Sequence, residues 1–209
     1  MNRAWWIYVL GVIATLLSFP YPPNFLALLT SEVVVILMIW AGLWFGAKHA
    51  LGSRIPPAKR AALSLVIGAV SGAIVLALLP LAGLQSRIIK EASIPLWKWL
   101  IIAFDSSILE EIIFRLFILS FVVWLLARFM RREPAVWIAI VVAALLFGAA
   151  HLNRWLDSGP AVIVAVILVN GAIAIAFGWI YVKWGIEAAM LSHFAGDVVV
   201  HILGPHVFI

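Results

Sequence analysis

Long apolar stretches separated by short polar gaps run through the whole chain. Seven such stretches occur, at residues 5–19, 25–45, 61–84, 97–126, 134–151, 160–182 and 185–203. Most of them come close to the roughly 20 apolar residues that an α-helix needs to cross a bilayer. The pattern therefore predicts an all-α protein, a polytopic transmembrane helix bundle with about seven spans.

The first stretch is the shortest, and it follows a basic residue, Arg3. Both features are also typical of a secretory signal peptide. No small-x-small cleavage pattern follows in residues 18–23, which are rich in proline and aromatic residues. We therefore expect an uncleaved first helix that is tilted or lies partly in the interface.

The third stretch carries a row of small residues, Ser64, Gly68 and Gly72, at every fourth position. Small side chains at this spacing let a neighbouring membrane helix approach closely. We expect this row to be a packing face and assign it no chemistry.

Composition supports the membrane assignment, because 66% of the 209 residues are hydrophobic and only 11% are charged. We expect residues 1–209 to form a single multi-pass integral membrane domain, in the cell membrane if the source is prokaryotic. The absence of cysteine excludes disulfides and thiolate metal sites. The net charge of +5 arises mostly in the gaps, where Lys and Arg contact lipid headgroups, so the bilayer is the expected partner and nucleic acid is not.

The fourth stretch contains charged residues that lipid would reject, Glu110, Glu111 and Arg115. Each charged side chain near a bilayer centre costs about 2.5–3.5 kcal/mol, so such residues normally face the bundle interior and pair. Glu111 and Arg115 are spaced i,i+4 and are predicted to pair, whereas Glu110 is rotated by about 100° and stays a spare carboxylate. The alternative is a buried network that only locks helices together.

Two other stretches carry matching polar residues. The fifth ends in Phe147-Gly-Ala-Ala-His151, and the seventh contains His193-Phe-Ala-Gly-Asp197 with His201 four residues further on, on the same helix face. Consecutive spans are antiparallel, so Glu110 early in the fourth span and His151 late in the fifth lie near one membrane face. The seventh span runs parallel to the fifth. We therefore predict one polar pocket between helices four, five and seven.

Such a pocket has the groups needed to activate water. A buried carboxylate can act as general base, one imidazole can share the proton, and another can stabilise an oxyanion. The sequence has no serine-centred elbow and no HExxH motif, and Ser106, Ser107 and Ser192 lack a base at a fixed spacing. A serine mechanism is therefore disfavoured, whereas a proton-coupled transporter uses the same residue types and stays open as an alternative.

These three elements in order carry a resemblance to a known family. Glu-Glu-x-x-x-Arg at 110–115, Phe-x-x-x-His at 147–151 and His-x-x-x-Asp at 193–197 resemble the CPBP family. That family comprises the CAAX prenyl endopeptidases of the Ras-converting type and the bacteriocin-processing (Abi) intramembrane proteases. The resemblance covers a catalytic core at 97–203 and leaves 1–96 as family-variable N-terminal helices.

The resemblance implies peptide-bond hydrolysis in the membrane, with a membrane-associated peptide or a lipidated protein as substrate. It implies that Glu110 and His151 activate the attacking water and that His193 and residue 197 stabilise the oxyanion. Glu111 and Arg115 would be the supporting ion pair. The family has been described both with and without a metal, so the cofactor is zinc or none, and the candidate zinc ligands by residue type are Glu110, His151 and His193.

The chain departs from the family pattern at position 197, where the family often has Asn and this chain has Asp. An ionised Asp cannot donate to an oxyanion, so Asp197 must be protonated, orient His193 or bind a metal. His201 is outside the shared pattern and is either an extra pocket residue or an interface residue.

The distribution of basic residues bears on sidedness. One side carries Arg3, Lys48, Arg54, Lys59, Arg60, Arg128, Arg131, Arg132 and Lys183, and the other carries Arg87, Lys90, Lys98 and Arg154. The positive-inside rule places the first group inside and the predicted pocket near the less basic face. This conflicts with a cytosolic CAAX substrate: either the charge count does not report the true orientation, or the substrate is not a cytosolic CAAX protein.

The leading hypothesis is thus an intramembrane endopeptidase. Two alternatives remain: a non-proteolytic binding or immunity protein on the same scaffold, and a proton-coupled transporter.

Overall fold

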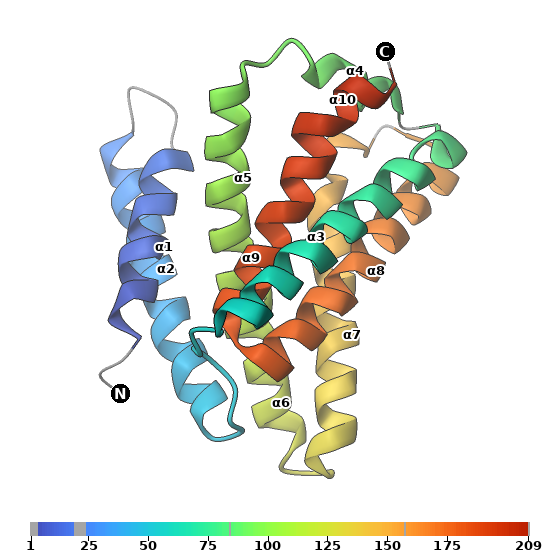
Figure 1. Ribbon diagram of the computed structural model, residues 1–209. Helices are drawn as coiled ribbons and strands as arrows, with labels where there is room; N and C mark the ends of the chain where they lie inside the picture. The colour runs from blue at the N-terminus through green and yellow to red at the C-terminus, as the bar shows by residue number, and fades with distance from the viewer. Residues whose placement is uncertain (1–3, 19–23, 84, 157, 209) are drawn as a thin grey trace.

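The computed structural model describes residues 4–18, 24–83, 85–156 and 158–208, and its regular structure in these ranges is entirely helical (Figure 1). The α-helices are α1 Trp5–Ser18, α2 Phe25–Ala47, α3 Ala58–Leu78, α4 Gln85–Glu91, α5 Leu96–Glu111, α6 Ser120–Leu126, α7 Arg132–Ala150, α8 Pro160–Trp184, α9 Ile186–Asp197 and α10 Gly204–Val207. Arg3 and residues 19–23, on which the expectation of an uncleaved first helix depends, lie outside the described residues.

The predicted polytopic helical bundle is confirmed. Five described helices are long and apolar enough to cross a membrane: Phe25–Ala47, Ala58–Leu78, Arg132–Asn153, Pro160–Trp184 and Ile186–Val207. Two of the predicted spans fall outside this group. Helix α1 has only 14 residues, and the fourth stretch carries Asp105, Glu110, Glu111 and Arg115 along its length. The third span ends at Leu78, earlier than predicted, because Pro80 lacks the N–H that would continue the helix.

The fourth and seventh spans each contain a π-helical segment that the sequence did not indicate. Segment η2 covers Ile112–Leu119 between α5 and α6, and η4 covers Val198–Leu203 between α9 and α10. Each π segment begins directly after an acidic residue of the predicted site, η2 after Glu111 and η4 after Asp197. Wider π turns are rare and often lie at functional sites, where they change the direction of the side chains that follow.

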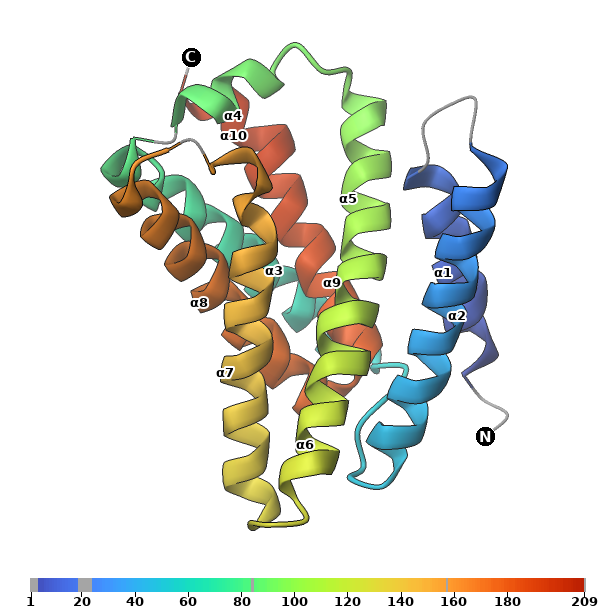
Figure 2. The same ribbon diagram turned by 180° about the vertical axis from the view of Figure 1, so that it is seen from behind.

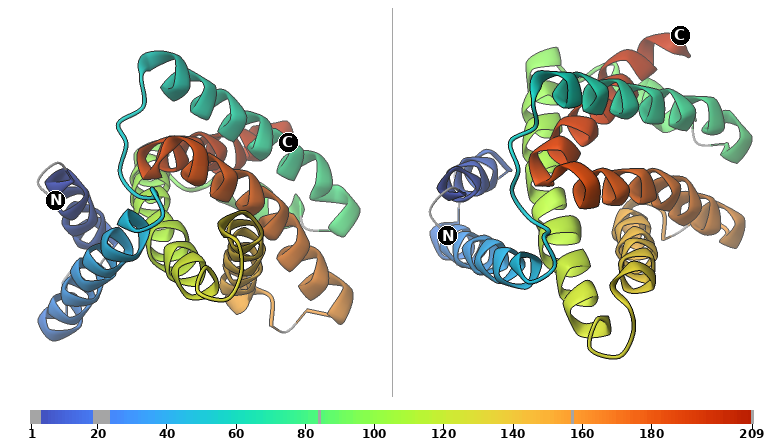
Figure 3. Two further views of the ribbon diagram at one scale, coloured as in Figure 1. Left: turned by 90° about the horizontal axis from the view of Figure 1, so that it is seen from below. Right: turned by 60° about the horizontal axis from the view of Figure 1, so that its bottom comes forward.

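The helices that carry the predicted site lie together in the bundle, and α3 and α8 cross them obliquely (Figures 1 and 2). Helix α7 packs against α8, and α3 packs against α9. Helices α1 and α2 contact α5 and η2 and lie to one side of the other helices, as the view from below shows (Figure 3). The α1–α2 hairpin therefore covers the face of α5 and η2 that points away from α9.

The contact between α3 and α9 depends on the predicted row of small residues. A Cβ at Gly68 would overlap the backbone carbonyl of Ser192, and a Cβ at Gly72 would lie 2.7 Å from the Gly196 carbonyl oxygen. The Ser192 hydroxyl donates to the Ser64 carbonyl at 2.8 Å. The packing role predicted for this row is confirmed, and it fixes the helix that carries His193.

We expect Gly68→Ala to destabilise the protein, because the added methyl group meets backbone atoms that cannot rotate away. Overpacking of this kind costs about 1–3 kcal/mol. Gly171→Ala is the matched control, since its added Cβ would lie at an ordinary 3.5 Å from the Ala144 carbonyl oxygen. Thermal unfolding of both purified variants in detergent checks this, and equal midpoints would contradict the tight α3–α9 contact.

Candidate active site

A cavity of about 360 Å³ lies between α3, α5, α7, α8 and α9. Its polar wall includes five side chains that come from three of these spans: Ser106, Glu110, His151, His193 and Asp197. Its apolar wall includes Phe147, Val166 and Phe177. The cavity extends to Glu91 of α4 and Asn153, at the end of the bundle opposite the α6–α7 loop (Figure 1). The predicted pocket between the fourth, fifth and seventh spans is present, with α3 and α8 as additional walls.

A buried ion pair between Glu111 and Arg115 supports the site. Arg115 Nη1 lies 3.0 Å from Glu111 Oε1, and both side chains are almost fully buried, at 1% and 0% exposed. Arg115 also donates to the Ala174 carbonyl at 3.4 Å, and its guanidinium carbon lies 4.6 Å from the centre of the Phe147 ring. The pair expected from the i,i+4 spacing is therefore formed, and it ties α5 to α7 and α8.

His193 connects this ion pair to the cavity. Its Nδ1 lies 2.9 Å from Glu111 Oε1. Because a carboxylate paired with Arg115 only accepts hydrogen bonds, Nδ1 carries the proton and donates. The ring is packed between Phe147 and Phe177, at centroid distances of 5.7 and 5.4 Å. The imidazole is thus held in one orientation, with Nε2 directed away from the ion pair.

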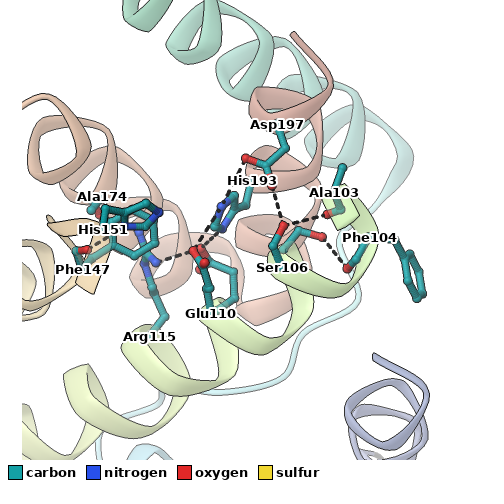
Figure 4. A network of polar contacts seen from close by, with 12 residues as sticks. Ala103, Phe104, Ser106, Glu110, Arg115, Phe147, His151, Ala174, His193 and Asp197 are labelled. Atoms are coloured by element: carbon teal, nitrogen blue, oxygen red, sulfur yellow. Dashed lines mark hydrogen bonds and ion pairs between the residues drawn. The ribbon is translucent and has the colours of Figure 1, made fainter. Parts of the chain in front are cut away.

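Two carboxylates face the free edge of His193. Nε2 lies 3.6 Å from Glu110 Oε2 and 3.6 Å from Asp197 Oδ1. Both distances are longer than a hydrogen bond. The two carboxylates therefore act on the His193 ring only through their charge, and Nε2 stays accessible to a third group. Figure 4 shows these three side chains directed toward one another.

Glu110 is one of the carboxylates that line the cavity. Its side chain is 29% exposed, in contrast to its fully buried neighbour Glu111. The Oε2 atom of Glu110 has no hydrogen-bond partner among the described protein atoms. A buried carboxylate oxygen without a partner can accept a proton from a molecule in the cavity, as a general base must.

His151 lines the same cavity at the C-terminal end of α7. Its Nδ1 lies 2.9 Å from the Phe147 carbonyl oxygen, so Nδ1 donates and Nε2 is the acceptor nitrogen. Segment η3, His151–Arg154, begins at this residue and turns the chain away from α7. His151 is close enough to Glu110 for the charge of one to act on the other. The structure therefore brings together Glu110, His151, His193 and Asp197.

Ser106 joins this group, although sequence reasoning gave it no role. Its hydroxyl lies 2.6 Å from Asp197 Oδ2, across the contact between α5 and α9 (Figure 4). One sequence signal was available: Ser106 precedes Glu110 by one helical turn, so the two share a face. Its partner on α9 required the tertiary structure.

His201 lies apart from these residues. Its Nδ1 is 2.8 Å from Glu91 Oε2 of α4, and its ring stacks on Trp99 at a centroid distance of 4.7 Å. These three residues line the main cavity and also a second cavity of about 290 Å³, which reaches His206 of α10. His201 is thus an extra pocket residue, in the wall shared by the two cavities.

The candidate zinc ligands do not form a ready metal site. In the ranges that the structure describes, no three His, Asp or Glu side chains converge in a geometry that would hold a metal ion. His193 Nδ1 is committed to Glu111 and His151 Nδ1 to a backbone carbonyl, so each ring has only its Nε2 atom free to act as a ligand.

Fold and site together define a class: an integral membrane protein whose helices enclose a cavity lined by carboxylates and imidazoles. Residues 92–199, just over half of the chain, match the family described as Rce1-like, type II CAAX prenyl endopeptidase. The chain belongs to this family, as its three motifs predicted, and its general class is that of a CAAX-type intramembrane protease. No curated protein and no solved structure matches the chain.

Proposed function

We propose that the protein is an intramembrane endopeptidase that hydrolyses a peptide bond near the membrane surface, with water activated by Glu110 and His151. The observation that carries this proposal is the unpartnered Glu110 carboxylate oxygen in a cavity that it shares with His151 and His193. The other buried side-chain oxygens without a described partner, such as Glu111 Oε2, belong to residues that are not among the described residues lining this cavity.

In the first step, Glu110 takes a proton from water while the water oxygen bonds to the carbonyl carbon of the substrate. The carbonyl π electrons move to the oxygen, which becomes an oxyanion. The Nε2–H of His193 donates to this oxyanion, since Nε2 faces the cavity and its partners lie at 3.6 Å. His151 lines the same cavity as Glu110 and is the second group that we propose to assist in this proton transfer.

In the second step, the oxyanion re-forms the carbonyl and the carbon–nitrogen bond breaks. The proton that Glu110 accepted passes to the leaving nitrogen, directly or through His151. One water and one peptide bond become one carboxylic acid and one amine. Glu110 is returned to its carboxylate form, so no further reactant is needed.

The proposed substrate is a membrane-associated peptide or a lipidated protein. The apolar side chains that α3, α7 and α8 contribute to the cavity are suited to an aliphatic or isoprenoid group. The family description names CAAX prenyl endopeptidases, which supports a C-terminal prenylated peptide as the first substrate to test.

The test is cleavage of a fluorogenic prenylated peptide by the purified protein, with and without a metal chelator. We expect cleavage that survives chelation, because among the described residues no three His, Asp or Glu side chains converge on a point where a metal ion would be held. Loss of activity on chelation, restored by added zinc, would overturn the glutamate-type mechanism. Absence of cleavage, together with substrate flux driven by a proton gradient in proteoliposomes, would instead identify a transporter.

We expect His151→Ala to lower kcat by about a hundredfold or more, because removing a general acid–base group costs roughly 10²–10⁴ in rate. The side chain is bonded only within its own helix turn, to Phe147, among the contacts described for it. The variant should therefore keep its elution volume in size-exclusion chromatography. Unchanged kcat in His151→Ala would remove this residue from the mechanism.

A further inference from the structure

Asp197 presents its two oxygens to different partners. Oδ2 accepts the Ser106 hydroxyl at 2.6 Å, and Oδ1 lies 3.6 Å from His193 Nε2. The Ser106 oxygen also lies 3.4 Å from the Ala103 carbonyl of its own helix. A serine has one hydroxyl proton, and the much shorter distance assigns it to Asp197. Asp197 therefore acts as the acceptor of this hydrogen bond.

This arrangement determines how the His193 ring is held. Its Nδ1–H is committed to Glu111, and its Nε2 faces oxygens of Glu110 and Asp197. Carboxylates on α5 and α9 therefore flank the Nε2 edge of the ring, while the Glu111–Arg115 pair holds the opposite edge. Asp197 Oδ1 lies 3.6 Å from Nε2, which is longer than a hydrogen bond, so Nε2 stays available to a substrate atom.

We infer that Ser106 is a positioning residue: its hydrogen bond holds Asp197 beside the Nε2 edge of His193, and this keeps Nε2 directed at the substrate carbonyl oxygen. The inference rests on the proposed function. It explains how the site can function with Asp197 at a position where an amide side chain is expected to donate to the oxyanion. His193 supplies that donor, and Asp197 holds His193 in place. The Ser106–Asp197 bond also joins α5 to α9, so it fixes the distance between Glu110 and His193.

The test is a double-mutant cycle on kcat with Ser106→Ala, Asp197→Ala and the combination. We expect Ser106→Ala to lower kcat about tenfold to a hundredfold with KM unchanged, the cost of a small displacement of a catalytic group. In the Asp197→Ala background, Ser106→Ala should have no further effect. Ser106→Thr keeps the hydroxyl and should restore most of the activity.

The matched control is Ser107→Ala. Ser107 is the adjacent serine, donates to the Phe104 carbonyl at 2.9 Å, and is not among the described residues that line the cavity. Its kcat should equal that of the wild type. Additive losses in the cycle would overturn the inference, and so would complete inactivity of Ser106→Ala with Asp197→Ala still active, which would mark Ser106 as a nucleophile.

A second double-mutant cycle measures the thermal unfolding midpoint, so it tests the Ser106–Asp197 hydrogen bond without an activity assay. Ser106→Ala and Asp197→Ala should each lower the midpoint, and the double variant should lower it by less than their sum. Additive shifts would overturn the inference even in an active enzyme. A wild type that cleaves no peptide but shows coupled shifts would overturn the catalytic part and the proposed function, and would leave the bond as structural.

Discussion

Glu110→Gln is expected to abolish peptide cleavage, with a loss of at least about a thousandfold in kcat, within the range for removing a general base. Gln has nearly the shape of Glu but cannot accept the proton of the attacking water. The Glu110 Oε2 atom has no hydrogen-bond partner among the described atoms, so the exchange should break no described hydrogen bond there and the variant should fold. Steady-state cleavage of the prenylated peptide measures the loss.

The control for this change is Glu133→Gln, which makes the same chemical exchange in the first turn of α7, outside the described residues that line the main cavity. We expect Glu133→Gln to keep wild-type kcat. Glu110→Asp should retain partial activity, because it keeps a carboxylate but withdraws it by one methylene. Substantial cleavage by Glu110→Gln would show that another group activates the water.

The placement of Glu110, His151, His193 and Asp197 around one pocket could be predicted from the sequence. Intramembrane charge is costly, so these residues had to face the bundle interior. The i,i+4 spacing then indicated that Arg115 pairs with Glu111 and not with Glu110. Because consecutive spans are antiparallel, His151 was expected at the same depth in the membrane as Glu110. Each step uses local geometry and the physics of the bilayer, which do not depend on how the helices pack in detail.

Contacts between distant helices could not be predicted. The Ser106–Asp197 bond, the Glu91–His201 pair and the π segments after Glu111 and Asp197 arise from the tertiary packing of the helices. The division into a core at 97–203 and variable helices at 1–96 stays a prediction. Helices α3 and α4 belong to the segment 1–96, but they nevertheless contribute residues to the wall of the cavity.

The largest effect on stability is expected for Arg115→Met. This change leaves the fully buried Glu111 carboxylate without its cation, and breaking one partner of a buried ion pair costs about 3–5 kcal/mol. A domain of this size then loses roughly 10 °C in its unfolding midpoint. Tryptophan fluorescence during heating in detergent measures the midpoint. An unchanged midpoint would contradict the view that Arg115 neutralises Glu111.

A double variant separates the structural from the catalytic consequence. Glu111→Gln with Arg115→Met removes both charges, and a buried ion pair replaced by neutral residues of similar volume often recovers the lost stability. The side-chain amide introduced by Glu111→Gln still offers an oxygen to His193 Nδ1, so the ring keeps its orientation. It no longer offers a negative charge, so His193 is a weaker cation and a weaker donor to the oxyanion. We therefore expect a midpoint within a few degrees of the wild type but a reduced kcat. If both returned to wild-type values, Glu111 and Arg115 would serve only to hold the helices together.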